Sequence, residues 1–123
     1  MKVLVTSKSF GKLSRKPIQR LQDAGFEVYG NEKGRLLNEE EMVEAIQGMD
    51  AVILGTEVFN RNVIDHADKL KIVSRYGVGL DKIDVEYLKE KGIALQIARN
   101  ANTNSVADHT IGLMLSLCHN ITR

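Results

Sequence analysis

The stretch SRYGVGLDKID, residues 74–84, follows a short β-rich run and carries two glycines close together. Gly77 and Gly79 have no side chains to obstruct an approaching ligand. The backbone amides of Val78 and Gly79 can therefore point at a carboxylate or phosphate as a small anion-binding nest. The same glycines could serve only to turn the chain sharply out of a sheet. The spacing by itself leaves both interpretations open.

Short β-rich runs alternate with helical patterns along the rest of the chain. Strands are expected at residues 3–5, 27–29, 51–54, 72–73 and 93–97. The helices between them are expected to begin near Ser14, Asn38, Asn60 and Asp84, and all but the Asn60 helix are expected to end at a glycine. Strands separated by helices need crossover connections, which in one sheet are almost always right-handed. The pattern predicts an α/β fold, a flavodoxin-like doubly wound sheet of five parallel strands followed by a long C-terminal helix.

The composition restricts the classes of protein to which the chain can belong. With 123 residues, 43% of them hydrophobic, it can build one core of ordinary domain size. Its 17 basic and 16 acidic residues form no basic stripe, so neither nucleic acid nor an anionic membrane is expected as a partner. The absence of a signal region and of a spanning apolar run predicts a cytoplasmic protein. Cys118 is expected to be a small buried hydrophobe.

The last part of the chain predicts a long apolar helix over residues 105–121. Apolar residues cover most of its surface and leave no broad polar face for water. Gly112 and Ser116 lie on one side of this helix and would let another backbone come close. Such a helix requires a cover, which could be a second domain, a second subunit or both. It could instead complete the face of its own sheet.

The pair Gly77-x-Gly79 matches the first two glycines of a dinucleotide-binding fingerprint. The complete pattern needs glycine or alanine three residues after the second glycine, where this chain has Lys82. The fingerprint should also open a helix at once, whereas Asp84, several residues later, is the better helix cap. Cofactor binding by this loop alone is therefore not expected.

Two motifs occur in order near the end of the chain. They are GVGLDKID at residues 77–84 and, after an intervening strand, NTNSVADHTIGLMLSLCHNI at residues 102–121. Together they resemble the D-isomer-specific 2-hydroxyacid dehydrogenases, the family of phosphoglycerate, D-lactate, glyoxylate and formate dehydrogenases. The resemblance implies an NAD-dependent oxidoreductase that acts on the CH–OH group of a small D-2-hydroxy acid. It also implies that residues 1–101 form a flavodoxin-like substrate-binding domain, and that residues 102–123 form a hinge helix leading to an absent NAD-binding Rossmann domain.

The resemblance assigns substrate binding to the glycine loop. Val78 and Gly79 match the family's loop whose backbone amides receive the substrate carboxylate. By the same match, Tyr76 and Gly77 shape the approach to those amides, and Leu80 flanks them. The partner implied for this loop is a small 2-hydroxy or 2-oxo acid.

The resemblance also assigns roles to the hinge helix. Its first residues match positions that come near the nicotinamide end of NAD, a cofactor bound mainly by the absent domain. These cofactor-binding candidates are Thr103, Asn104, Val106 and Ala107. In the family the same helix contributes to dimer contacts, so a homodimer through it is expected. The family's catalytic Arg, Glu and His lie beyond residue 123, so no catalytic residue is assigned and the chain alone is expected to be inactive.

Other polar residues carry weaker signals. Asp108 and His109 are adjacent on the expected helix, and adjacent helix side chains point in different directions, so a structural role is the better interpretation. Asp108 also stands where the family more usually has a glutamate. No set of His, Cys, Asp or Glu has convincing metal-ligand spacing, so no metal site is expected.

The loop after the third expected strand departs from the family. Residues 54–58 read LGTEV, where many members carry an Arg-Ser pair. Glu57 would disfavour a doubly charged phosphate unless Lys8, Lys12 or Arg61 offset its charge. 3-Phosphoglycerate is therefore one candidate among several small 2-hydroxy acids.

A function from another class is a stand-alone flavodoxin-like binding or signalling module. A phosphorylated receiver would need an aspartate at the end of the third strand, where this chain has Gly55 and Thr56. A flavin module is harder to dismiss, because residues 6–12 form a hydroxyl-rich loop in a plausible phosphate position. The sequence offers little aromatic cover for a flavin ring.

Overall fold

The computed structural model describes residues 1–121, and in this part of the chain strands and helices alternate. All five strands of the sheet are parallel. The strands are β1 (Lys2–Val5), β2 (Glu27–Gly30), β3 (Ala51–Leu54), β4 (Ile72–Arg75) and β5 (Ala94–Ile97). The helices are α1 (Lys16–Asp23), α2 (Glu39–Ile46), α3 (Arg61–Asp65), α4 (Val85–Glu90) and α5 (Thr103–Cys118). Each expected strand is confirmed, with its ends shifted by two residues at most.

The strands lie in the order β2-β1-β3-β4-β5, so β1 pairs with both β2 and β3. The direction in which successive strands are added reverses beside β1. In doubly wound sheets, ligands collect outside the carboxyl ends of the strands at such a reversal. The flavodoxin-like fold is confirmed, and the loops that follow β1, β3 and β4 lie at this edge.

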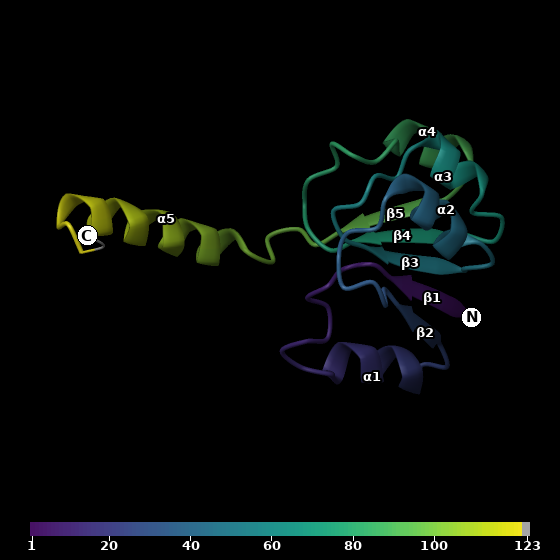
Figure 1. Cartoon of the computed structure of the whole chain (residues 1–123), viewed down its shortest axis with the longest axis horizontal. Helices are drawn as coiled ribbons and strands as arrows, with labels where there is room; N and C mark the ends of the chain where they lie inside the picture. The colour runs from purple at the N-terminus through teal and green to yellow at the C-terminus, as the bar shows by residue number, and fades with distance from the viewer. Residues whose placement is uncertain (122–123) are drawn as a thin grey trace.

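The main core lies between the sheet and three helices. Figure 1 shows α2, α3 and α4 together on one side of the sheet, with α1 on the opposite side near β2. Apolar residues at every second position of the central strands face the three helices, as a half-covered sheet requires. The largest fully buried side chains are Phe59, Met42, Ile46, Leu54 and Leu88. This packing fixes the strand ends from which the candidate loops depart.

Polar caps begin three of the helices as expected. The side chains of Asn38, Asn60 and Asp84 each accept a hydrogen bond from a backbone N–H in the first turn of α2, α3 and α4. α1 differs slightly, because its N-cap is Arg15 and the helix begins at Lys16. The Ser14 hydroxyl still accepts the Lys16 N–H at 3.3 Å, and Pro17 fixes the backbone of the first turn.

We expect the cap of α2 to make folding stability depend on pH. Hydrogen bonds from Arg35, Lys33 and the Asn38 N–H hold the pKa of the Glu41 carboxyl well below its usual value of 4.5. A lowered pKa in the folded state adds stability above the unfolded pKa, which is lost as the pH falls below about 4.5. Glu41→Gln should therefore lower the unfolding midpoint at pH 7, and the difference from the wild type should shrink in acid. Thermal denaturation across pH measures this difference.

Glu40→Gln is the matched control for this measurement, because it removes one charge from the same turn without breaking an ion pair of the described residues. An equal loss for the two variants at pH 7 would contradict the role given to the Glu41 ion pairs.

Helix α5 projects away from the rest of the domain (Figure 1). Its side chains are exposed except for a half-buried Ser116. The large apolar side chains of α5 and the residues after it are 53–76% exposed: Val106, Ile111, Leu113, Met114, Leu115, Leu117 and Ile121. The interpretation that this helix completes its own sheet is therefore wrong. The expectation that Cys118 is buried is also wrong, since it lies exposed on the same uncovered helix.

The last two residues of the expected hinge segment, 122–123, lie outside the described part of the chain. Among residues 1–121, neither α5 nor any other helix has the length and apolar character needed to cross a membrane.

Candidate functional site

Three loops meet at the carboxyl edge of the sheet, and we name them by the strand or residues that define them. The β1 loop is residues 7–12, the β3 loop is residues 55–59, and the glycine loop is residues 76–80. A parallel bridge between Phe59 and Ile83 joins the β3 loop to the segment after the glycine loop. The rings of Phe10 and Tyr76, 5.8 Å apart and nearly perpendicular, join the β1 loop to the glycine loop. The three loops therefore form one connected surface.

The backbone amides of the glycine loop divide into paired and unpaired groups. The Tyr76 N–H donates to the Leu54 carbonyl and the Gly77 N–H to the Arg75 carbonyl, both at 2.9 Å. The amides of Val78, Gly79 and Leu80 donate to no acceptor among residues 1–121. Val78 and Gly79 are exposed residues, whereas Leu80 is half-buried. Two adjacent unpaired amides form the kind of concave donor set that binds small anions.

A hydrogen bond from the Ala98 N–H fixes the orientation of the peptide group between Gly77 and Val78. This N–H donates to the Gly77 carbonyl at 3.1 Å, which ties the glycine loop to the end of β5. Because a trans peptide is planar, its N–H points opposite to its carbonyl. The Val78 N–H therefore points away from β5.

Arg75, the last residue of β4, holds the glycine loop in shape. Its Nε donates to the Gly79 carbonyl and its Nη1 to the Tyr76 carbonyl, both at 2.9 Å. Gly77 has a φ of +150°, and a Cβ at this position would lie 3.0–3.2 Å from the guanidinium. Glycine is therefore required at 77 for both the backbone conformation and the approach of Arg75. Sequence reasoning missed Arg75, although a charged residue at the end of a strand was a signal.

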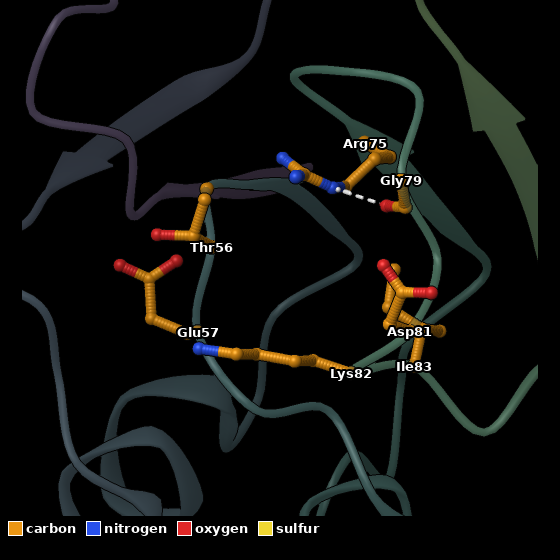
Figure 2. A pocket seen from close by; sticks show the side chains of 8 residues that line it. Thr56, Glu57, Arg75, Gly79, Asp81, Lys82 and Ile83 are labelled. Carbon is orange, nitrogen blue, oxygen red and sulfur yellow. Dashed lines mark hydrogen bonds between the residues drawn. The ribbon is translucent and has the colours of Figure 1, made fainter.

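A cavity of about 220 Å³ lies between the β3 loop and the glycine loop. Figure 2 shows the side chains that line it, with Arg75 bonded to Gly79 on one side and Glu57 on the other. A second cavity, of about 300 Å³, lies between the glycine loop and residues 98–102, the segment that leads into α5. The glycine loop therefore separates two spaces that are each large enough for a small organic acid.

Glu57 is the most unusual residue at this edge, because it carries a carboxyl group but only 3% of the residue is exposed. Its Oε2 accepts a 2.7 Å hydrogen bond from the Thr6 hydroxyl, which in turn accepts the Gly55 N–H at 2.8 Å. Its Oε1 is buried and has no hydrogen-bond partner in the described part of the chain. A Cβ at Gly55 would lie 2.7 Å from Oε2, so glycine leaves the space that the carboxylate fills. The sequence analysis singled out Glu57 as an acidic residue of this loop. It did not predict that the side chain is buried or that it accepts a hydrogen bond from Thr6.

The cations proposed to offset Glu57 lie in different places. Arg61 is engaged elsewhere, since its Nε bonds Asp84 at 3.0 Å and its guanidinium lies over the Tyr87 ring. The Tyr87 N–H and the Arg61 guanidinium together hold the pKa of Asp84 below its ordinary value. Lys8 lines a cavity together with Glu57, whereas Lys12 lines a cavity on the other side of the β1 loop. Of the three, only Lys8 shares a cavity with Glu57.

The four cofactor-binding candidates lie in the first two turns of α5 and are all exposed. The segment just before them lines the 300 Å³ cavity together with Tyr76 and Gly77. The glycine loop does not open a helix, since α4 begins only at Val85. The described residues of the glycine loop therefore do not form a cradle for the pyrophosphate of a dinucleotide.

The other polar candidates show no catalytic arrangement. Asp108 and His109 are both exposed on α5, and no hydrogen bond joins them. His66 Nδ1 lies 2.8 Å from the Asn62 carbonyl at the end of α3, which is a local structural contact. Within residues 1–121, no group of three His, Cys, Asp or Glu side chains could hold a metal ion.

The fold defines a doubly wound α/β domain whose ligand edge carries a glycine loop. The family model described as "D-isomer specific 2-hydroxyacid dehydrogenase, catalytic domain" matches residues 3–121. The chain therefore belongs to this family of dehydrogenases. The family expected from the two motifs is confirmed.

Individual relatives support the same assignment. The chain is 42% identical over 123 residues to D-3-phosphoglycerate dehydrogenase of Methanocaldococcus jannaschii, covering 98% of this chain and 22% of that protein. The NAD+-bound 3-phosphoglycerate dehydrogenase of Entamoeba histolytica has a TM-score of 0.82 at 32% identity, covering 94% of this chain and 38% of that one. The TT0316 protein of Thermus thermophilus has a TM-score of 0.87 at 29% identity, with coverages of 98% and 38%. The chain thus spans 22–38% of the length of these three proteins.

Proposed function

We propose that this chain is the substrate-binding part of an NAD-dependent oxidoreductase that acts on the CH–OH group of a small D-2-hydroxy acid. The observation that carries the proposal is the pair of unpaired, exposed amides at Val78 and Gly79. The substrate carboxylate would accept hydrogen bonds from both amides, with Tyr76, Gly77 and Leu80 around it. Bonds from backbone donors to an ionised acceptor are short and strong, so they suit the recognition of a carboxylate.

Arg75 would preorganise the proposed carboxylate site, because it fixes the shape of the glycine loop in the absence of substrate. Its guanidinium holds two carbonyls of the glycine loop, so those carbonyls do not face an incoming anion. Its positive charge also lies close to the proposed site. A loop whose shape is set in advance loses less conformational entropy on binding.

The reaction of the family needs more than carboxylate binding. When bound, NAD would supply the acceptor for the hydride that leaves C2 of the acid. Thr103, Asn104, Val106 and Ala107 would contact the nicotinamide end, since the segment before them borders the same cavity as the glycine loop. The proton acceptor and the rest of the NAD site would belong to a Rossmann domain outside this chain. Residues 1–101 would then form the substrate domain and residues 102–123 the hinge between the two domains.

The identity of the acid is a finer proposal. The relatives from M. jannaschii and E. histolytica are named as phosphoglycerate dehydrogenases, which makes 3-phosphoglycerate a candidate for this chain. The E. histolytica enzyme is described as bound to NAD+, which supports NAD as the cofactor here.

We also propose that α5 joins two copies of the chain. A helix whose large apolar side chains are 53–76% exposed leaves an apolar surface that favours association. A Cβ at Gly112 would have no atom within 4 Å, so a second helix could approach closely there. A homodimer through α5 would cover this surface.

The chain by itself is expected to bind small 2-hydroxy acids weakly and not to oxidise them. In an NMR titration of the ¹⁵N-labelled chain, D-lactate should shift the amide signals of Val78 and Gly79 more than those of Tyr76 and Gly77. The reason is that only the first two amides lack an acceptor. With NAD present, no NADH should form.

Propane-1,2-diol, which lacks the carboxylate of lactate, is the control ligand and should leave the same amide signals in place. Equal shifts from the diol would contradict carboxylate recognition by the loop. Sustained NADH formation by the chain alone would show that it contains the catalytic groups.

A further inference from the structure

The near-neutral composition of the whole chain conceals an uneven distribution of charge at its start. Residues 1–22 contain no acidic residue, and the basic residues among them are Lys2, Lys8, Lys12, Arg15, Lys16 and Arg20. The last five of these form no ion pair with any residue of the described range 1–121. Clustered charge of one sign raises the local concentration of ligands of the opposite sign. This part of the domain therefore attracts anions.

A cavity of about 430 Å³ lies beside this basic segment, between the β1 loop, the start of α1 and the end of β2. Lys8, Lys12 and Arg15 line it. The nearby carboxyl groups belong to other spaces, since Glu57 lines the cavity across the β1 loop and Glu32 lines one on the far side of β2. The charged side chains that line the 430 Å³ cavity are therefore all positive.

The backbone of the β1 loop adds neutral donors to these charges. The amides of residues 7–11 donate to no acceptor in the described part of the chain, and all of these residues except Ser9 line the cavity. The Lys12 N–H donates to the Ser9 carbonyl at 3.2 Å, and Gly11 has a φ of +78°, so the loop forms a tight turn. Successive unpaired amides in a turn make the concave donor set that binds anions.

The other walls of the cavity are mostly apolar. They are formed by the side chains of Val5, Phe10, Ile18 and Val28. Pockets of this size that bind small organic molecules commonly combine apolar walls with a few polar groups. A phosphate monoester carries about 1.5–2 negative charges at pH 7 and three acceptor oxygens, more than a carboxylate offers. Three cations and a row of amides suit a phosphate, and the apolar walls suit an organic body attached to it.

We propose that the cavity between the β1 loop and α1 binds a small organic phosphate. The phosphate would contact Lys8, Lys12, Arg15 and the amides of the β1 loop, and the organic body would pack against the apolar walls. No residue of the glycine loop lines this cavity, so the site is separate from the proposed carboxylate site. The inference therefore does not rest on the proposed function.

The test is an NMR titration of the ¹⁵N-labelled chain with phenyl phosphate at low ionic strength. Saturable shifts are expected at the amides of residues 7–11, with a dissociation constant on the order of 1 mM or below. Phenol lacks the phosphate, benzoate carries only one charge and inorganic phosphate lacks the organic body. Each should bind at least about five-fold more weakly. A titration without saturation at these amides, or equal affinity for any of the three, would overturn the inference.

Paired variants show whether the cavity or the general charge attracts the ligand. Lys12→Gln/Arg15→Gln removes two cations that line the cavity and should weaken the binding of phenyl phosphate by about 10-fold or more. Lys16→Gln/Arg20→Gln removes the same charge from exposed residues of α1 that do not line it, and should change the affinity by less than about two-fold. Equal losses would overturn the inference. If circular dichroism shows that either double variant is unfolded, Arg15→Gln and Lys16→Gln give the same comparison.

D-lactate separates this site from the proposed carboxylate site. At saturating D-lactate, the affinity for phenyl phosphate should be unchanged, and displacement of phenyl phosphate by the acid would overturn the inference. A failure of the proposed function has another signature, because it would appear as absent D-lactate shifts at Val78 and Gly79. In that case the phenyl phosphate titration and its variants still decide the inference.

Discussion

Replacing Gly79 with leucine in the full-length dehydrogenase is expected to raise the KM for the 2-hydroxy acid on the order of 100-fold, with the KM for NAD changed by less than about three-fold. The leucine side chain would cover the unpaired amides of Val78 and Gly79, and each hydrogen bond to a charged group is worth roughly 1.5–3 kcal/mol. Steady-state kinetics with each substrate varied in turn measures the two constants.

The effect should come from the size of the side chain and not from the backbone. Gly79 is exposed, its φ lies outside the left-handed region, and a Cβ there would come no closer than 3.5 Å to Asp81. Gly79→Ala is therefore the matched control and should raise the KM for the acid far less. An equal rise in the two KM values for Gly79→Leu would show that the loop does not select the acid.

Placing a charge on α5 is expected to separate the proposed dimer. Leu117 is 76% exposed and lies one turn after Leu113, itself 53% exposed, so both face the same side of the helix. Leu117→Glu removes a contact worth about 1.5–3 kcal/mol and would force a carboxylate into an apolar interface. The dimer dissociation constant should rise by at least about 100-fold. Sedimentation velocity of the chain over a range of concentrations measures this constant.

The control for this experiment is Ser105→Glu. It adds the same charge to the first turn of α5, where a helix accepts an acidic residue well and where the surface is already polar. It should leave the dimer intact. A wild-type chain that remains monomeric at high concentration would contradict association through α5, and so would equal dissociation of the two variants.

Features of this chain that depend on neighbouring residues could be predicted from the sequence, and features that depend on distant residues could not. The strands and the caps at Asn38, Asn60 and Asp84 were predictable, because each depends on residues within a few positions of one another. The glycine loop was predictable for the same reason. That its amides are unpaired was only a hypothesis, since the sequence could not show whether distant carbonyls would accept hydrogen bonds from them.

The surroundings of Glu57 show where prediction from sequence ended. Thr6 and Glu57 are 51 positions apart, and they meet only because β1 lies beside β3 in the sheet. The sequence indicated only that the loop after the third strand carries an acidic residue, and a glutamate is usually exposed. The burial of Glu57 and its bond to Thr6 therefore follow from the pairing of strands and not from the residues around it in the sequence.

The sequence by itself determined the order of strands and helices, the family and the place of the glycine loop, because local patterns and contiguous motifs specify these. Only the tertiary structure showed that Arg75 holds the glycine loop and that α5 projects from the domain. It also showed that Glu57 is buried, with a hydrogen-bond partner among the described residues for Oε2 but not for Oε1. These three features depend on which strand ends are neighbours and on what the core leaves uncovered. No short stretch of residues encodes such relations, since they arise only when the whole sheet is assembled.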